Sequence, residues 1–154
     1  MRRRKGSLFT RRTAVRAFVV FLTLLPAMLM AEMAGDLGDR LERAHDAYRR
    51  GELATADRLF TDVLEAAPRL SEVWYNRGIV RYDLGRYEEA VADFTAAIER
   101  DQTFVAAIFN RANAYFRLER FEDAYEGYRR VLEIEDDPDA EHNIDVVEQI
   151  LASQ

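Results

Sequence analysis

The stretch WYNRGIVRYDLGRYEEAVADFTAAIERD, residues 74–101, decides the fold. Apolar residues recur in it at helical spacing, the pattern breaks at Gly85, and it resumes two residues later. A glycine there suits the left-handed residue that ends a helix, so the stretch predicts a helix, a tight turn and a second helix. Small residues at Gly78 and Ala90 would let the two helices approach closely, and Phe94 would fill the space beside the next hairpin.

The same pattern occurs three times at a spacing of 34 residues, in residues 37–70, 71–104 and 105–138. The aligned small residues are Ala44, Gly78 and Ala112 in the first helices and Ala56, Ala90 and Ala124 in the second, and the aligned aromatic residues are Tyr48, Tyr82 and Phe116, then Phe60, Phe94 and Tyr128. Internal repeats of this length indicate stacked hairpins, whose last apolar face needs a cover. Residues 139–152, with Asp139 as N-cap, are predicted to form this capping helix.

The repeats resemble the tetratricopeptide repeat family, and the middle one is the best match because it has Trp74, Gly78, Gly85 and Phe94 at the family's signature positions. The resemblance implies an all-α fold, an α-solenoid of three helix-turn-helix repeats plus a C-terminal capping helix, over residues 35–154.

Residues 1–34 have a different composition. The basic segment up to Arg16 is followed by 15 uncharged, mostly apolar residues, Ala17 to Ala31, and then Glu32. This arrangement is typical of a secretory signal, and as a helix it would reach only about 22 Å, short of a bilayer core of about 30 Å. The alternatives are a cleaved signal peptide and an uncleaved membrane anchor. The pair Arg11-Arg12 leaves a twin-arginine signal open as well. We therefore predict an exported protein of bacterial type, periplasmic or anchored on the extracytoplasmic side of a membrane.

The charge of the rest of the chain is acidic. Residues 1–34 hold seven of the 22 basic residues and one of the 28 acidic residues. The rest of the chain therefore has 15 positive and 27 negative charges, a net charge of −12. Such a balance repels the phosphates of nucleic acids, so no nucleic-acid partner is expected.

The sequence offers little for catalysis. It has no cysteine, and its two histidines, His45 and His142, lack the neighbours that a zinc site or a catalytic triad requires. No glycine-rich phosphate loop is present. We expect no enzymatic activity, no metal and no cofactor.

The resemblance implies a concave groove lined by the first helix of each repeat. The candidates for peptide contact are His45, Tyr48 and Arg49; Tyr75, Asn76, Ile79, Tyr82 and Asp83; and Phe109, Asn110, Asn113, Phe116 and Arg117. Amides can satisfy a peptide backbone, and aromatic rings give contact area at low entropic cost. There is a structural alternative for the asparagines Asn76 and Asn110, which would serve the neighbouring helix. The aromatic residues could likewise be part of the core; these are Tyr48, Tyr82 and Phe116.

Some family members bind a C-terminal carboxylate through a clamp of lysines, asparagines and an arginine. Asn76 falls on an asparagine position of that clamp, but the lysine positions hold Leu41 and Ala106 and the arginine position holds Asn110. The resemblance therefore does not imply an acidic tail as the ligand.

The sequence thus predicts a non-catalytic scaffold or adaptor on the extracytoplasmic side of a membrane, which binds a peptide or helix of another protein in its groove. Two alternatives stay open: a cytoplasmic scaffold of the same fold, and a module that associates with itself. The membrane would be a partner only if the N-terminal segment is an anchor.

Overall fold

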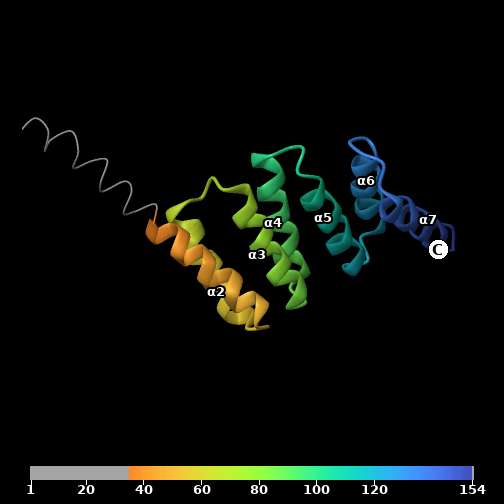
Figure 1. Ribbon diagram of the computed structural model, residues 1–154. Coiled ribbons are helices and arrows are strands. Elements are labelled where there is room, and N and C mark those ends of the chain that lie inside the picture. The colour runs from red at the N-terminus through yellow and green to blue at the C-terminus, as the bar shows by residue number, and fades with distance from the viewer. Residues whose placement is uncertain (1–34, 154) are drawn as a thin grey trace, which may run out of the picture. The chain divides into compact units, whose positions relative to one another are not determined.

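The computed structural model describes residues 35–153, and these residues form helices and turns without a strand (Figure 1). A helix covers residues 35–49, and the helices that follow are α2 (Leu53–Ala66), α3 (Ser71–Asp83), α4 (Tyr87–Arg100), α5 (Val105–Arg117), α6 (Phe121–Leu132) and α7 (Pro138–Ala152). The predictions about residues 1–34 lie outside the described part of the chain. The chain divides into two units at residue 40, and α2 to α7 belong to the second unit, residues 40–154.

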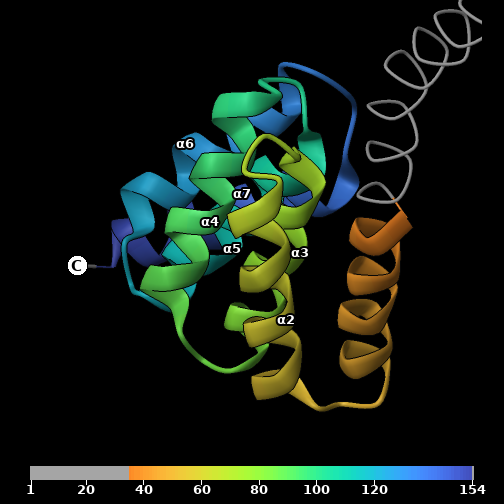
Figure 2. The same ribbon diagram turned by 90° about the vertical axis from the view of Figure 1, so that its left-hand side faces the viewer.

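Within this second unit each helix packs on the next one along the chain, from α2 to α7, as the two views of the ribbon show (Figure 2). In addition α3 touches α5, so the first helices of consecutive hairpins lie side by side. The all-α solenoid of helical hairpins predicted from the sequence is confirmed.

The turn inside each hairpin uses a left-handed residue, as predicted for the glycine turn of the middle hairpin. The φ angles are 73° at Gly51 and 74° at Gly85, while the third hairpin places Glu119 in the same conformation with φ 58°. Two backbone hydrogen bonds close the middle turn, from Gly85 N to the Tyr82 carbonyl at 2.9 Å and from Arg86 N to the Arg81 carbonyl at 2.9 Å. This pattern satisfies carbonyls that a helix end would otherwise leave without donors.

The repeated small and aromatic residues form the core. The exposed fractions of Phe60, Phe94 and Tyr128 are 1%, 0% and 2%, and the alanines aligned with Ala90 are also fully buried. A methyl group on Gly78 would lie 2.7 Å from the Phe94 ring, so only glycine permits this approach of α3 to α4. Burial of each such ring stabilises the fold by roughly 1.5–3 kcal/mol.

The capping helix α7 begins one residue before the predicted boundary, and the predicted N-cap, Asp139, is wrong. Asp137 is the N-cap, and its carboxylate accepts hydrogen bonds from the backbone of Asp139 and Ala140, both at 2.9 Å. Pro138 occupies the first helical position, where a missing N–H costs nothing. The helix buries Val147 and packs Ile144 and Leu151 against the core.

Candidate functional site

The first-helix surface consists of the predicted contact residues on residues 45–49, α3 and α5. Figure 1 shows that α3 and α5 come from successive hairpins. Three sets of side-chain contacts join residues of this surface to one another and to neighbouring helices. These contacts decide which polar groups remain available to a ligand.

The amides of α5 form a hydrogen-bonded series with two tyrosines. The Asn110 amide donates to the Tyr75 hydroxyl at 3.1 Å and to the Ala106 carbonyl at 2.9 Å, and the Asn113 amide donates to the Asn110 oxygen at 3.4 Å. The Tyr128 hydroxyl donates to the Asn113 oxygen at 2.7 Å. The structural alternative therefore applies to Asn110, because its amide joins α5 to Tyr75 of α3.

Tyr48 connects the first repeat to the second. Its hydroxyl donates to the Asp83 carboxylate at 2.8 Å. Burial, followed by this hydrogen bond and the charge of Asp83, raises the pKa of Tyr48 to about 12. Burial also raises the pKa of Tyr75, although its hydrogen bond from Asn110 acts in the opposite direction. Both phenols are therefore neutral at ordinary pH and remain hydrogen-bond donors.

Arg117 forms a cationic cluster with aromatic rings of the middle repeat. Its guanidinium carbon lies 4.7 Å from the centroid of Tyr87 and 6.0 Å from that of Tyr82, and the two rings meet edge to face at 5.2 Å. The arginine is exposed. It can offer a charge to a ligand while its stem rests on the rings.

The other predicted residues divide between surface and core. His45 packs edge to face on Phe60 at 5.2 Å, and Phe109 packs on Tyr128 at 5.6 Å. Of the remaining members, Ile79 packs against the Phe94 cluster and Phe116 packs on Phe121. Asn76 is partly exposed, and Arg49 is exposed and paired with Asp46. Asn76, Arg49 and Arg117 are thus the polar members with most freedom to meet a ligand.

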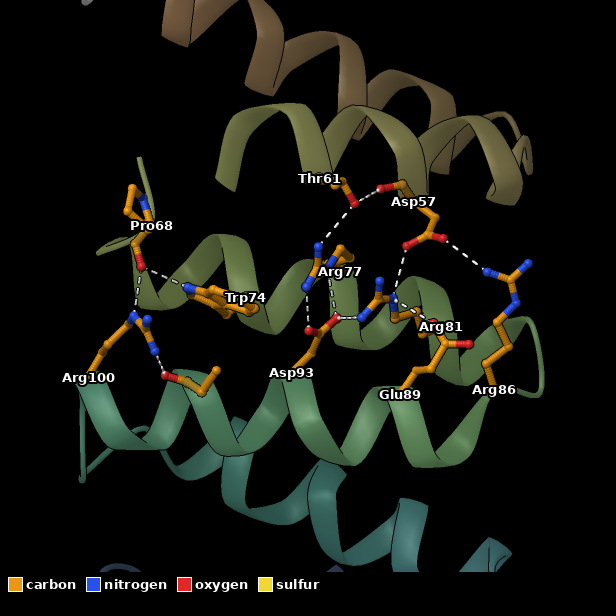
Figure 3. A network of polar contacts seen from close by, with 11 residues as sticks. Asp57, Thr61, Pro68, Trp74, Arg77, Arg81, Arg86, Glu89, Asp93 and Arg100 are labelled. Atoms are coloured by element: carbon orange, nitrogen blue, oxygen red, sulfur yellow. Dashed lines mark hydrogen bonds and ion pairs between the residues drawn. The ribbon is translucent and has the colours of Figure 1, made fainter. Parts of the chain in front are cut away.

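Sequence reasoning missed a buried polar network between α2, α3 and α4 (Figure 3). Asp93, with an exposed fraction of 1%, accepts from Arg77 Nε at 2.9 Å and Nη2 at 2.7 Å, and from Arg81 Nη1 at 2.9 Å. Arg81 Nε donates to Asp57 at 3.0 Å, and Arg86 donates to the same carboxylate at 3.0 Å. Asp93 is therefore a buried carboxylate whose charge two guanidinium groups compensate.

One signal in the sequence could have found this network. Asp93 lies on the apolar stripe of α4 with Ala90, Phe94 and Ala97, where an acid is costly without a partner. The network joins two consecutive hairpins and fixes their relative position. It does not form a metal site: no group of three or more potential ligands is close enough to hold a metal ion anywhere in residues 35–153.

Comparison with known proteins identifies the repeats. The family model described as tetratricopeptide repeat matches residues 71–104, and a second model of the same description matches residues 105–138. The mouse protein DnaJ homolog subfamily C member 7 is 31% identical over 130 residues, which cover 79% of this chain and 26% of that protein. Mouse RNA polymerase II-associated protein 3 is 28% identical over 114 residues, which cover 73% of this chain and 17% of that protein. The chain spans about a quarter or less of the length of these relatives.

A solved structure, the first tetratricopeptide domain of Spaghetti (RPAP3) bound to the HSP90 peptide SRMEEVD, has the same fold. Its TM-score is 0.72 at 25% identity, over 75% of this chain and 93% of that one. Residues 71–138 are thus tetratricopeptide repeats, and the described part of the chain has the fold of a tetratricopeptide-repeat solenoid.

The predicted localisation is contradicted by these relatives. They are eukaryotic proteins named for DnaJ and for association with RNA polymerase II, and they give no support to an exported or membrane-anchored protein of bacterial type. Within residues 35–153, none of the helices has the length and the apolar character that crossing a membrane requires.

Proposed function

We propose that this protein is a non-catalytic scaffold that binds a peptide or helix of another protein on its first-helix surface. The alignment of side chains from three hairpins on one surface, joined through Tyr48–Asp83 and Tyr75–Asn110, carries this proposal. Extended peptides bind well to such mixed surfaces of aromatic rings and amides. The similar domain that holds an HSP90 peptide supports the same use of the fold.

The relatives favour the cytoplasmic scaffold among the alternatives that the sequence left open. They also make the acidic HSP90 tail the first ligand to test. The clamp positions of this chain hold Leu41, Ala106 and Asn110, and none of these supplies the positive charge that a terminal carboxylate needs. We therefore propose that the natural ligand is neutral or basic, in keeping with the acidic charge of the repeats.

Binding of the labelled peptide SRMEEVD to the full chain, followed by fluorescence anisotropy, tests the choice of ligand. The native chain should bind it weakly. The triple substitution Leu41→Lys, Ala106→Lys and Asn110→Arg should strengthen binding by at least about tenfold, because each charge-assisted contact adds about 1.5–3 kcal/mol before binding costs. Tight binding by the native chain would contradict the proposed ligand class.

Selection of peptides from a random displayed library tests the surface itself. The best peptide should lose affinity when Asn76→Ala and Arg117→Ala are combined, and keep it when Arg58→Ala is made. Arg58 is a matched control because it is exposed on α2, outside the surface. Equal binding by the two variants would overturn the proposal. Sedimentation of the free chain would detect self-association, the remaining alternative.

A further inference from the structure

Arg111 occupies the position in the third repeat that Arg77 holds in the second, 34 residues earlier. The threonine that Arg77 contacts is also repeated: Arg77 Nη1 donates to Thr61 Oγ1 at 3.0 Å, and Arg111 Nη1 donates to Thr95 Oγ1 at 3.3 Å. The carboxylate is not repeated, because the position of Asp93 is taken by Gly127. The third repeat therefore has the arginine without its anion.

The loss leaves the guanidinium of Arg111 incompletely paired. Its Nε is buried and has no hydrogen-bond partner, whereas Nε of Arg77 donates to Asp93 at 2.9 Å. Burial lowers the pKa of Arg111, and the charge of Arg130 acts in the same direction. A buried donor without an acceptor destabilises the fold, so an anion that completed the pair would recover that cost.

A pocket lies where the missing carboxylate would project. It has a volume of about 340 Å³. The residues that line it are Arg111, Tyr115, Gly127 and Arg130 and the three acids Asp123, Glu126 and Glu133. Two of the acids are already paired on α6, Asp123 with Arg120 at 2.6 Å and Glu126 with Arg129 at 3.8 Å. A second pocket of about 360 Å³ shares Arg111 and Arg130 and extends to Thr95 on α4.

We propose that the pocket formed by Arg111, Gly127 and Arg130 binds a carboxylate, supplied by an Asp or Glu side chain of a docked protein. The second repeat shows the chemistry in this same chain, where a planar carboxylate meets a planar guanidinium at two points. A dianionic phosphate fits less well, because the three acids that line the pocket repel its second charge. The site uses residues separate from the first-helix surface, so the proposal does not depend on the proposed function.

The site can be tested with acetate as the probe. The full chain is labelled with ¹⁵N, and the arginine Nε–Hε resonances are followed as sodium acetate replaces sodium chloride at constant ionic strength. The Arg111 resonance should shift to saturation. The Arg77 resonance should stay in place, because its acceptor is already present. Absence of a saturable shift at Arg111, or an equal shift at Arg77, would overturn the proposal, and so would tighter binding of inorganic phosphate than of acetate.

Variants supply a second measurement. Backbone amide shifts of Gly127 should follow acetate in the native chain and in the control Arg58→Lys, and should lose this response in Arg111→Lys, which keeps the charge but not the two-point geometry. A response that survives in Arg111→Lys would contradict the assignment of the site to this guanidinium.

The missing carboxylate can also be restored within the chain. A Cβ on Gly127 would come within 2.7 Å of the Ala112 Cβ, so Gly127→Asp must be combined with Ala112→Gly. The second repeat already has a glycine, Gly78, at the position of Ala112. The double variant should lose the acetate response and unfold at a higher temperature than Ala112→Gly alone. If it fails to fold, the Arg111→Lys measurement still decides the proposal.

Discussion

The Arg77 guanidinium and the Asp93 carboxylate form a buried two-point ion pair between α3 and α4, with N–O distances of 2.9 and 2.7 Å. Their exposed fractions are 8% and 1%. Removing one partner of such a pair leaves a charge without compensation in the core, which is more costly than losing both partners. Figure 3 shows that Arg81 approaches the same carboxylate from the side.

We therefore expect Asp93→Ala to lower the free energy of unfolding by about 3–5 kcal/mol, measured by urea denaturation. Asp62→Ala is the matched control, because its pair with Arg58 is exposed and 3.6 Å long; it should cost less than about 1 kcal/mol. If Arg77→Met combined with Asp93→Leu is as unstable as Asp93→Ala alone, the cost does not come from an uncompensated charge.

The turn at Glu119 should be improved by glycine. Glu119 has φ 58°, a conformation that costs a residue with a Cβ about 1–2 kcal/mol, and the other two hairpins place glycine there. Glu119→Gly should raise the free energy of unfolding by about 1 kcal/mol, after the greater flexibility of the unfolded chain is subtracted. The reverse change, Gly85→Ala, should lower the free energy of unfolding, because Gly85 has φ 74°. An added Cβ would meet no atom within 4 Å, so a loss of stability would come from backbone strain and not from a steric clash. A loss of stability in Glu119→Gly would contradict this account.

The sequence was sufficient for the fold because the repeat presents the same local pattern three times. Helical periodicity, the turn at Gly85 and the small residues beside Phe94 all agree, and agreement across levels is what makes such a fold predictable. The start of α7 was predicted less well, because Asp137 and Asp139 are both suitable N-caps in the sequence. Pro138 decides between them, since it belongs at the first helical position.

The candidate site was less predictable because its partners are distant in the sequence. The pairing of Tyr75 with Asn110 spans 35 residues and depends on how α3 lies against α5. Likewise Arg77 and Asp93 lie on different helices, and the periodicity of either helix alone says nothing about the pair. Gly127 could not be recognised from the sequence as a position that lacks a carboxylate, because only the structure shows that Asp93, at the same position of the second repeat, pairs with Arg77.

Gly78 should not tolerate alanine, although alanine normally favours a helix by about 0.5–1 kcal/mol over glycine. Its added Cβ would lie 2.7 and 2.8 Å from two carbons of the Phe94 ring, which is fully buried and cannot move aside freely. Overpacking of this kind costs about 1–3 kcal/mol, so the clash should prevail and thermal unfolding should occur at a lower temperature. Adding Phe94→Leu to Gly78→Ala tests the mechanism. If the double variant loses as much stability as the two single variants lose together, the clash is not the cause.

The stability of the protein should fall at alkaline pH through Tyr48. The fold raises the pKa of this phenol from 10.0 to about 12, so the neutral form is favoured in the folded state. The contribution of the neutral Tyr48 phenol to the free energy of unfolding is fully present below pH 10.0 and is lost as the pH rises toward 12. Tyr75 and Tyr128, whose pKa values are also raised by burial, act in the same direction. Tyr48→Phe lacks the ionisable group, so its free energy of unfolding should decline less steeply over this range than that of the native protein, even if loss of the bond to Asp83 makes it less stable at neutral pH. Parallel declines in urea denaturation across this range would show that Tyr48 does not carry the effect.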